Sequence, residues 1–589
     1  MTVSRLRALS LALLVLMLVM LPLLPLPDFW IIQLNYIGLY TLPVLGLVLL
    51  TGVGGLTSFG QAAFVGIGAY TTAWLTLNTG ISPWFTLFIG IALTCASALI
   101  IGAITLRMSG HYLPLATIAW GLSLYYLMGN LQALGKYDGL LGVPGLSIAG
   151  VELGQQRLFY ALVWLIVLVA CVALLRLLDS RAGRAIRSLK NGAQMAEAMG
   201  VNTLHYKIGI FVFAAVLASI SGWLIAHFQR TVNPSPFGLK MGIEYLFMAV
   251  LGGASQVWGA IVGTSVFKVL EDQLQVLLPR MIGTSGNYET IVFGILLVLV
   301  LKYQPDGLWD FVRRRLPRPP RERDWQGAPA LPVRDLPAAG DTVLEVQAIR
   351  KTFGGLLAVN DITFAIRAGQ IMGLIGPNGA GKSTTFNLIT GMLALSGGAI
   401  RLRGQDISGL DSRRIAERGI ARTFQHVKMI ADMTVLENVA LGAHLRGRHG
   451  AIAAMLRLDR AEERQLLHEA ERQLQRVGMG HLLHEQAGNL AMGQQRLLEI
   501  ARALCADPAL LLLDEPAAGL RHKEKQALAA VLRQLRGDGM SILLVEHDMG
   551  LVMDVCDRMV VMEFGTRLME GTPDEVRQSH EVRAAYLGT

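Results

Sequence analysis

The stretch Gly376-Pro-Asn-Gly-Ala-Gly-Lys-Ser-Thr384 decides the fold of the C-terminal part of this chain. An apolar run typical of a strand, residues 370–375, precedes it, and an apolar-periodic segment typical of a helix follows. Glycines at these spacings let successive backbone N–H groups turn toward one anion, and the start of a helix adds a favourable dipole. The pattern predicts a phosphate-binding loop made of Gly376, Pro377, Asn378, Gly379, Ala380, Gly381, Lys382, Ser383 and Thr384.

A second element fits this loop. Residues 510–515 form an apolar, buried-type strand that ends in two carboxylates, Asp514 and Glu515. We expect Lys382 to reach the β- and γ-phosphates of ATP, and Ser383 and Asp514 to hold Mg²⁺. Glu515 would polarise the attacking water. A core strand capped by acids is the plainer alternative, but it is weak beside a phosphate loop.

His547 follows another buried-type strand, residues 542–545. It could sense the γ-phosphate of ATP. A lone histidine in this position is more often structural, so the residue type alone leaves both interpretations open.

The N-terminal half differs sharply in composition. The chain is 53% hydrophobic and 16% charged overall, and up to about residue 303 it is a series of long apolar runs with few charges. A membrane-spanning helix needs about 20 apolar residues. This predicts about ten spans, near residues 9–27, 30–50, 57–78, 83–106, 111–130, 157–178, 206–228, 243–258, 260–279 and 288–303.

The first apolar run could be a signal peptide. It is long for one, contains Pro22 and Pro25, lacks a small-x-small cleavage site and is followed at once by further spans. We therefore interpret it as an uncleaved first span.

The net charge of +9 sits largely beside the apolar runs. Residues 176–207 include six basic and two acidic residues, and residues 313–318 include four arginines and no acidic residue. Basic flanks are retained on the cytoplasmic side and face anionic lipid headgroups, which fits ten spans that begin inside. Nucleic-acid binding is disfavoured because no aromatic-interleaved basic strip accompanies the charge.

Glycines are concentrated at two places in the membrane half, residues 52–68 and Gly252-Gly253. Small residues let helices pack closely in lipid, and they also permit interrupted helices that line a substrate path. Both interpretations stay open. No chain of Asp, Glu or His lies at membrane depth, so a proton relay is disfavoured and the energy source must lie in the soluble half.

Two connecting segments complete the organisation. Residues 179–200 are amphipathic and end at Gly200, which suits a short helix docking on an ATPase or a plain juxtamembrane helix. Residues 316–340 are rich in Pro, Arg and Ala and predict a semi-extended tether. The domains expected are a permease (1–310), a linker (311–340) and an ATP-binding domain (341–589).

Residues 341–589 resemble the ATP-binding subunit of an ABC transporter. Gln425, in Arg422-Thr-Phe-Gln, matches the family's loop glutamine, which links Mg²⁺ and water to the membrane partner. Residues 517–520 match the dimer loop, His547 the switch histidine, and Phe353 the aromatic that stacks on adenine. The signature sequence, which contacts ATP on the opposite subunit, is matched by Leu490, Ala491, Met492, Gly493 and Gln494.

The signature departs from the family at one position. Ala491 stands where the family usually has serine, so one hydroxyl donor to phosphate is missing. The glycine N–H and the helix dipole remain, so ATP binding should survive. The site that uses this signature is expected to hydrolyse ATP more slowly than the site that uses this phosphate loop.

Both halves resemble subunits of branched-chain amino acid importers. The ATPase does so through residues 494–502, 514–520 and 545–549, and the membrane half through Ser58–Tyr70, Leu251-Gly-Gly253 and Gln304–Leu308. The fusion of two normally separate subunits is unusual. In that family the Arg184–Gly200 region is the coupling helix, ending here in Glu197, Ala198, Met199 and Gly200.

The resemblance implies a multi-domain fold, with an all-α polytopic membrane domain followed by an α/β ATPase with a helical subdomain. It implies ATP and Mg²⁺ as cofactors, and a second permease, a second ATPase and an extracytoplasmic solute-binding protein as partners. The location implied is the cytoplasmic (inner) membrane with the ATPase in the cytoplasm. Related systems carry urea, amides or aromatic acids, which stay as alternative substrates. An exporter half-transporter and a membrane-anchored regulator are disfavoured by the number of spans.

Overall fold

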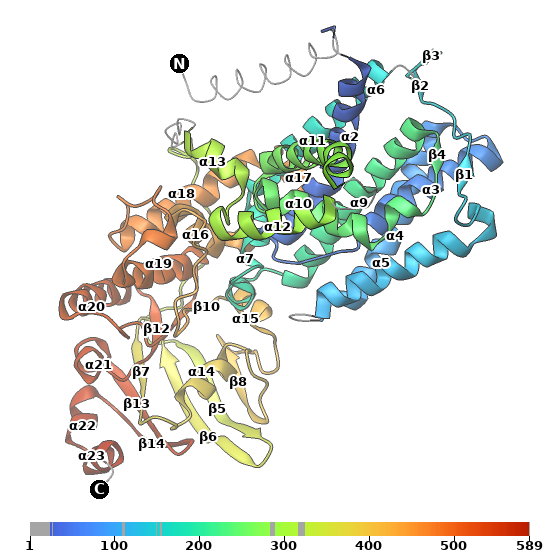
Figure 1. The fold of residues 1–589 in the computed structure, drawn as a ribbon. Helices are drawn as coiled ribbons and strands as arrows, with labels where there is room; N and C mark the ends of the chain where they lie inside the picture. Colours follow the sequence, from blue (N-terminus) through green and yellow to red (C-terminus); the bar gives the residue numbers. More distant parts are fainter. Residues whose placement is uncertain are drawn as a thin grey trace. The chain divides into compact units, whose positions relative to one another are not determined.

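The computed structural model describes residues 24–25, 27–108, 112–148, 150–153, 156–282, 289–315 and 324–587 (Figure 1). The chain divides into two compact units. The first comprises Met1–Asp179 and Leu204–Glu322, and the second comprises Ser180–Thr203 and Arg323–Thr589. Residues 180–203 thus belong to the unit of the C-terminal half, although helices of the first unit flank them in the sequence.

The described part of the first unit is built mainly of helices, as its long apolar runs predict, because a helix satisfies its own backbone hydrogen bonds in lipid. Short β-strands occur only in its connecting loops, β1 (Leu140–Leu141) pairing with β4 (Thr231–Val232). The main helices are α2 (Asp28–Leu47), α3 (Gln61–Thr79), α4 (Pro83–Thr105), α5 (Tyr112–Asn130), α6 (Gln156–Leu178), α9 (Thr203–Gln229), α10 (Leu239–Gly252), α11 (Val257–Ile282), α12 (Glu289–Tyr303) and α13 (Leu308–Arg315).

The expected count of ten spans is not confirmed. Among the described residues, four helices are long and apolar enough to cross a membrane, or up to six if each of two bent helix pairs counts as one span. The four are Asp28–Val53, Pro83–Thr105, Gln156–Leu178 and Thr203–Gln229. The first predicted span, near residues 9–27, lies almost wholly outside the described residues.

Glycines mark the irregular places of this unit. Helix α2 continues as a π-helix, η2 (Val48–Val53), and residues 55–60 are not helical before α3 begins. Helices α10 and α11 are bent by 116° at Gly253, so the ranges 243–258 and 260–279 form a bent pair. A Cβ on Gly52 would lie 1.6 Å from the backbone oxygen of Ala254 in that bend. Glycine at position 52 is therefore required for close backbone approach.

The C-terminal unit contains two sheets. The larger has the order β10-β11-β12-β7-β13-β14, in which the first five strands are parallel and β14 pairs antiparallel to β13. Its strands are β7 (Ile371–Ile375), β10 (Ile420–Arg422), β11 (Leu510–Asp514), β12 (Ser541–Val545), β13 (Arg558–Glu563) and β14 (Thr566–Gly571). The smaller, antiparallel sheet has the order β6-β5-β8-β9, with β5 (Thr342–Phe353), β6 (Leu356–Arg367), β8 (Gly397–Leu402) and β9 (Gln405–Asp406).

The parallel sheet is covered on both faces, and alternate residues of one strand show this. In β12, Ile542 and Leu544 pack in a core with α20 (His522–Gly537) and α21 (Met549–Val555). Leu543 and Val545 pack in a second core with α14 (Lys382–Ile389) and the antiparallel sheet. Figure 1 shows α20 and α21 on one side of the parallel strands and α14 with β5 and β8 on the other. A strand that is buried on both faces needs apolar residues at successive positions, and this explains the unbroken apolar runs of β11 and β12.

The remaining helices of the second unit include a helical group between β10 and β11, as the resemblance implies. It consists of α16 (Val435–Ala440), η5 (Leu441–Arg446), α17 (Ala451–Met455), α18 (Arg460–Arg476) and α19 (Met492–Cys505). Helix α15 (Ser412–Arg418) precedes β10, and α22 (Pro573–Gln578) and α23 (His580–Leu587) follow β14.

The linker differs from the expected tether. Residues 308–315 are helical, residues 316–323 lie outside the described range, and residues 324–336 pack on the second unit. Two apolar side chains explain the difference, because Trp325 and Leu331 are 5% and 6% exposed within the larger core. An extended segment without periodicity can still be ordered when its few apolar residues are buried.

Candidate functional site

The phosphate loop, residues 376–384, connects β7 to α14 as the sequence predicts. Gly376, Gly379 and Gly381 have φ angles of 149°, 82° and 94°, which favour glycine. Lys382 Nζ donates to the carbonyl oxygens of Gly376 (2.7 Å) and Pro377 (2.9 Å), so the ammonium group lies over the loop. Burial lowers the pKa of Lys382, an effect that the nearby Glu515 and Asp514 oppose.

Asp514 lies at the end of β11 and is 6% exposed. Its Oδ1 is buried without a hydrogen-bond partner, and its backbone N–H donates to Thr423 Oγ1 (3.1 Å). Burial raises the pKa of Asp514 to about 6, while the Arg422 guanidinium acts in the opposite direction. An unpartnered carboxylate oxygen at the edge of the phosphate loop is a fitting ligand for a hydrated Mg²⁺.

Glu515, Gln425 and His547 come together from three different strand ends. Gln425 Nε2 donates to Glu515 Oε2 (3.1 Å), and His547 Nδ1 lies 3.8 Å from the same oxygen. Glu515 has a φ of 46°, a left-handed conformation that is uncommon for a residue other than glycine. Parallel strands place these residues together because their carboxyl ends share one sheet edge.

Sequence reasoning missed the carboxylate that organises this edge. Glu546 is 0% exposed and accepts hydrogen bonds from the backbone N–H groups of Ala517 (2.6 Å), His547 (3.0 Å) and Asp548 (3.2 Å). It therefore ties the predicted dimer loop to the segment that carries His547. The sequence signal that could have identified Glu546 is its position directly after an apolar strand and directly before His547.

Phe353 and residues 491 and 492 of the signature sequence are exposed, whereas Leu490 is buried. Phe353 is 44% exposed at the end of β5, and Lys351 Nζ lies 5.1 Å from its ring centre. Met492 in the signature is 51% exposed. Within residues 324–587, no hydrogen bond or ion pair joins residues 490–494 to the phosphate loop, so one copy of this unit does not bring the two together.

The start of α19 shows the consequence of Ala491. Gln494 Oε1 accepts from the Ala491 backbone N–H (3.0 Å), which is half of a capping box. The alanine methyl group has no atom that could accept a backbone N–H in return. An alanine in place of serine at the N-cap, the residue that precedes the first helical residue, costs about 1 kcal/mol.

The segment 180–203 packs on the helical group of its own unit. It forms two short helices, α7 (Arg181–Ser188) and α8 (Ala193–Ala198), rather than one. The face predicted from its apolar spacing is largely confirmed, since Ala185, Leu189, Ala196 and Met199 are buried. Gly200 has a φ of 85°, and a Cβ there would lie 2.2 Å from Leu445.

Three arginines of α7 hold this segment in place. Arg184 forms a two-pronged ion pair with Glu463 of α18, with Nη2 3.1 Å from Oε2, and both side chains are at least 94% buried. Arg181 donates to the carbonyl oxygens of His444 and His449, each at 2.6 Å. Arg187 pairs with Glu437 of α16 at 3.5 Å.

No sequence pattern pointed to Glu463, because α18 is rich in charged residues throughout. The Glu197 carboxylate accepts a hydrogen bond from Thr203 Oγ1 (2.6 Å) at the end of the same segment. Arg184 is thus the predicted coupling residue that bears the docking charge.

The first unit contains a cavity of about 290 Å³. It lies at the start of α6 and the end of α9, which are the ends farthest along both helices from residues 180–203. Its wall is mixed, with apolar side chains such as Ile32, Phe159 and Phe228 and polar or charged side chains from Gln156, His227 and Arg230. His227 is held by Thr72 Oγ1 (3.0 Å) and the Pro144 carbonyl oxygen (2.7 Å).

Each half of the chain matches a known protein family. Residues 31–301 match the family described as the branched-chain amino acid transport system permease component. Residues 359–518 match the ABC transporter family, and residues 566–589 match the branched-chain amino acid ATP-binding cassette transporter family. The fold and the site thus define an ABC transporter in which a permease and an ATPase share one chain.

Individual relatives narrow this class. The chain is 44% identical over 249 residues to the high-affinity branched-chain amino acid transport ATP-binding protein LivG of Salmonella typhimurium, covering 42% of this chain and 98% of LivG. It is 43% identical over 249 residues to BraF of Pseudomonas aeruginosa, again covering 42% of this chain and 98% of the relative. The chain belongs to the branched-chain amino acid ABC transporter family.

Among solved structures, a nucleotide-free ATP-binding cassette from an ABC transporter is 29% identical over 42% of this chain and all of its own length, with a TM-score of 0.38.

Proposed function

We propose that this protein imports branched-chain amino acids across the cytoplasmic (inner) membrane, driven by ATP hydrolysis in its own C-terminal unit. The observation that carries the proposal is the packing of residues 180–203, which join α6 to α9, on the unit that holds the nucleotide site. The assembled transporter would contain a second permease, a second ATPase and an extracytoplasmic solute-binding protein. The ATPase would lie in the cytoplasm.

The nucleotide site supports the ATPase step through named residues. The phosphate loop and Lys382 would hold the β- and γ-phosphates, with Phe353 against the adenine. Asp514, Ser383 and Gln425 would hold Mg²⁺, which supplies charge neutralisation on the phosphates when bound. Glu515 would orient and polarise the attacking water, with Gln425 and His547 beside the same carboxylate oxygen.

The second ATPase would complete the site. Ala491 and Met492 of the signature are exposed, and within residues 324–587 no hydrogen bond or ion pair joins residues 490–494 to the phosphate loop of their own unit. Both observations support a role on nucleotide held by the partner. Closure of two such units would move α16 and α18, and Arg184 and Arg187 would pass that motion to α6 and α9.

The cavity in the first unit supports a place for the solute. Arg230 has the charge to bind an α-carboxylate, and Ile32, Phe159 and Phe228 offer apolar surface to a branched side chain. Residues 180–203 are here named the coupling segment. The cavity lies at the ends of α6 and α9 that are not joined to this segment in the chain, which suits delivery from an extracytoplasmic binding protein. The glycine-rich bend near Gly52 would lie farther along the path.

Uptake by the assembled transporter tests the proposal. Vesicles that enclose ATP should accumulate labelled leucine, isoleucine or valine when the cognate binding protein is added outside. Accumulation of urea, an amide or an aromatic acid instead would show that the proposed substrate is wrong but that the protein is an importer. Outward movement of solute would favour an exporter and overturn the proposal.

A further inference from the structure

The linker between the two halves lies against the same elements that receive the coupling segment. Residues 324–336, here named the strap, touch three of these elements, which are α18, η5 and α15. The coupling segment touches the same three, through Arg184 on α18, Arg181 on η5 and α8 on α15. A linker that served only to join the two halves would not need to contact the elements on which the coupling segment docks.

The first anchor of the strap is Trp325. Its indole Nε1 donates to Glu471 Oε2 at 2.6 Å, and both residues are 5% exposed. Glu471 and Glu463 lie on α18 two turns apart, so one helix carries the anchor of the strap and the ion pair of the coupling segment. A hydrogen bond to a buried charge is among the stronger kinds of hydrogen bond.

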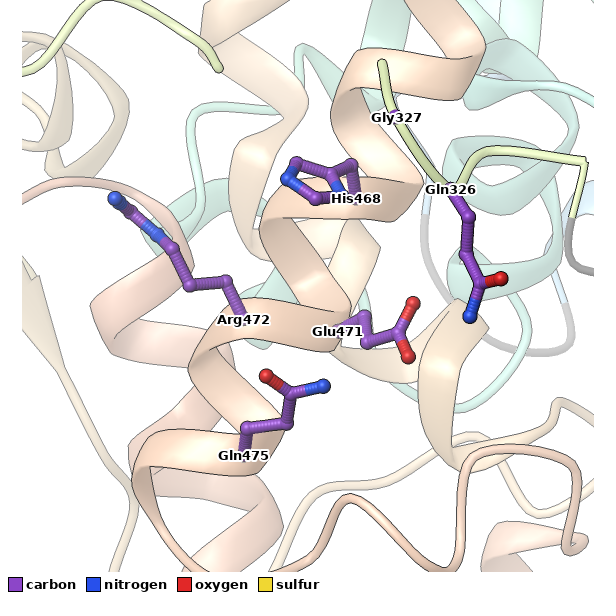
Figure 2. Close-up of a pocket in the computed structure, with 6 residues that line it drawn as sticks. All are labelled: Gln326, Gly327, His468, Glu471, Arg472 and Gln475. Carbon is purple, nitrogen blue, oxygen red and sulfur yellow. The ribbon is translucent and has the colours of Figure 1, made fainter. Parts of the chain in front are cut away.

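A cavity of about 320 Å³ shows where the strap meets the helix. Figure 2 shows Gln326 and Gly327 of the strap beside α18, with His468, Glu471, Arg472 and Gln475 on the helix around the opening. Because this space separates Gln326 and Gly327 from the helix, the close contact at this point of the strap is concentrated at Trp325.

The second anchor is Arg334. Its guanidinium donates to the last carbonyl oxygens of α15, those of Arg418 (2.5 Å) and Glu417 (3.4 Å), and its backbone N–H donates to Asp507 Oδ2 (2.5 Å). A cation is favourable at the end of a helix, where carbonyl groups lack partners. Helix α15 is the element on which α8 packs.

A third contact joins the strap to η5. Arg446 of η5 donates to the Pro332 carbonyl oxygen (2.8 Å) and pairs with Glu469 of α18 at 3.3 Å. His444, two residues earlier, offers its carbonyl oxygen to Arg181 of the coupling segment (2.6 Å). The strap, η5 and the coupling segment are therefore linked through consecutive hydrogen bonds.

We propose that the strap is part of the surface on which the coupling segment docks, together with α18, η5 and α15; this surface is here named the coupling platform. Trp325 and Arg334 are positioning residues that hold α18 and α15 in place for residues 180–203. ATP binding and hydrolysis then drive transport efficiently only while the strap is seated. This inference rests on the proposed import function. It assigns the linker a role beyond keeping the two halves on one chain.

Conservative variants test this role in the full chain within the assembled transporter. Trp325→Phe keeps an aromatic ring in the core but removes the donor to Glu471, and Arg334→Ala removes the contacts with α15. Val333→Ala is the matched control, because Val333 is in the strap but 59% exposed. ATP hydrolysis, leucine uptake into vesicles and nucleotide affinity are measured for each.

We expect ATP hydrolysis and nucleotide affinity to stay within about twofold, and uptake per ATP hydrolysed to fall about tenfold in each anchor variant, as expected for loss of a charge-assisted hydrogen bond. The control should match the wild type. A merely structural role would instead lower hydrolysis and uptake together. Full coupling in both anchor variants, or a parallel loss of hydrolysis, would overturn the inference.

A cleavage experiment separates the platform from the tether. A protease site inserted after Pro320 and cut in the assembled transporter leaves residues 324–336 attached to the ATPase. Uptake per ATP should then be retained. Loss of coupling on cleavage as large as in Trp325→Phe would assign the effect to the tether and contradict the inference, whereas absence of uptake by the wild type would refute the proposed function itself.

Discussion

Removal of one partner of the Arg184–Glu463 pair should uncouple ATP hydrolysis from transport. The two side chains are 3% and 6% exposed, and Glu463 also accepts from the Arg181 backbone N–H (3.1 Å). Arg184→Ala leaves the buried carboxylate without its cation. Breaking a buried ion pair from one side costs about 3–5 kcal/mol.

This cost predicts the size of the effect. If it falls on the docked state of residues 180–203, the docking equilibrium weakens about a hundred to several thousand fold, since 1.4 kcal/mol is a factor of ten. Arg187→Ala is the graded comparison, because its pair with Glu437 is longer (3.5 Å) and more exposed. That variant should lose about 1 kcal/mol or less.

The assay is uptake per ATP hydrolysed by the assembled transporter in vesicles. Arg184→Ala should keep ATP hydrolysis and lose most of the uptake, and Arg187→Ala should lose little. The double variant Arg184→Met with Glu463→Leu replaces the pair by apolar side chains and should recover much of the loss. Arg184→Met and Glu463→Leu, made singly, complete the comparison. Wild-type coupling in Arg184→Ala, or a loss in the double variant equal to the sum of the losses of these two single variants, would refute the reasoning.

Four other predictions concern the ATPase unit and the solute cavity. Glu515→Gln should bind ATP but hydrolyse it at least a hundredfold more slowly and hold the ATPase pair closed; normal turnover contradicts this. Ala491→Ser should add a helix cap worth about 1 kcal/mol and speed hydrolysis at the site using this signature; equal loss of turnover on disabling either site of the wild type would refute the asymmetry. Burial, with the nearby Arg181 and Arg184, lowers the pKa of His444 from 6.5 to about 3, so the folded state binds fewer protons and stability falls as pH drops below 6.5. The loss is about 2 kcal/mol between pH 7 and 5, and His444→Gln should flatten the pH dependence of the thermal unfolding midpoint. Arg230→Ala should raise the solute concentration for half-maximal uptake about tenfold or more at unchanged ATP hydrolysis. If that concentration stayed the same, the cavity would be excluded as the solute-binding site.

The nucleotide site was predictable because its chemistry is local in sequence. The phosphate loop, Asp514 and Glu515 each follow an apolar strand within a few residues, and parallel strands bring their carboxyl ends to one edge. Gln425 joined them only through the resemblance to a family, and the residue type of His547 left a γ-phosphate sensor and a structural role both open. Their shared contact with one oxygen of Glu515 is a product of the fold.

The docking residues were predictable on one side only. The apolar spacing of residues 185–199 indicated a buried face, but nothing marked Glu463 among the charges of α18. Trp325 was also missed, because a single aromatic in a Pro-rich segment has no periodicity. The glycines at 252 and 253 indicated an interrupted helix as one of two interpretations, and the bend there agrees with it. Composition alone did not decide between the two, since two short apolar helices and two spans have the same composition.

The most direct test of the account is uptake of labelled leucine by vesicles that contain the assembled transporter and enclose ATP and Mg²⁺, with binding protein outside. The account predicts accumulation against a gradient with the wild type and none with Lys382→Ala, because the loop then lacks the ammonium group for the β- and γ-phosphates. Accumulation that persists in Lys382→Ala, or that proceeds equally without ATP, would contradict the claim that nucleotide in this chain drives its permease.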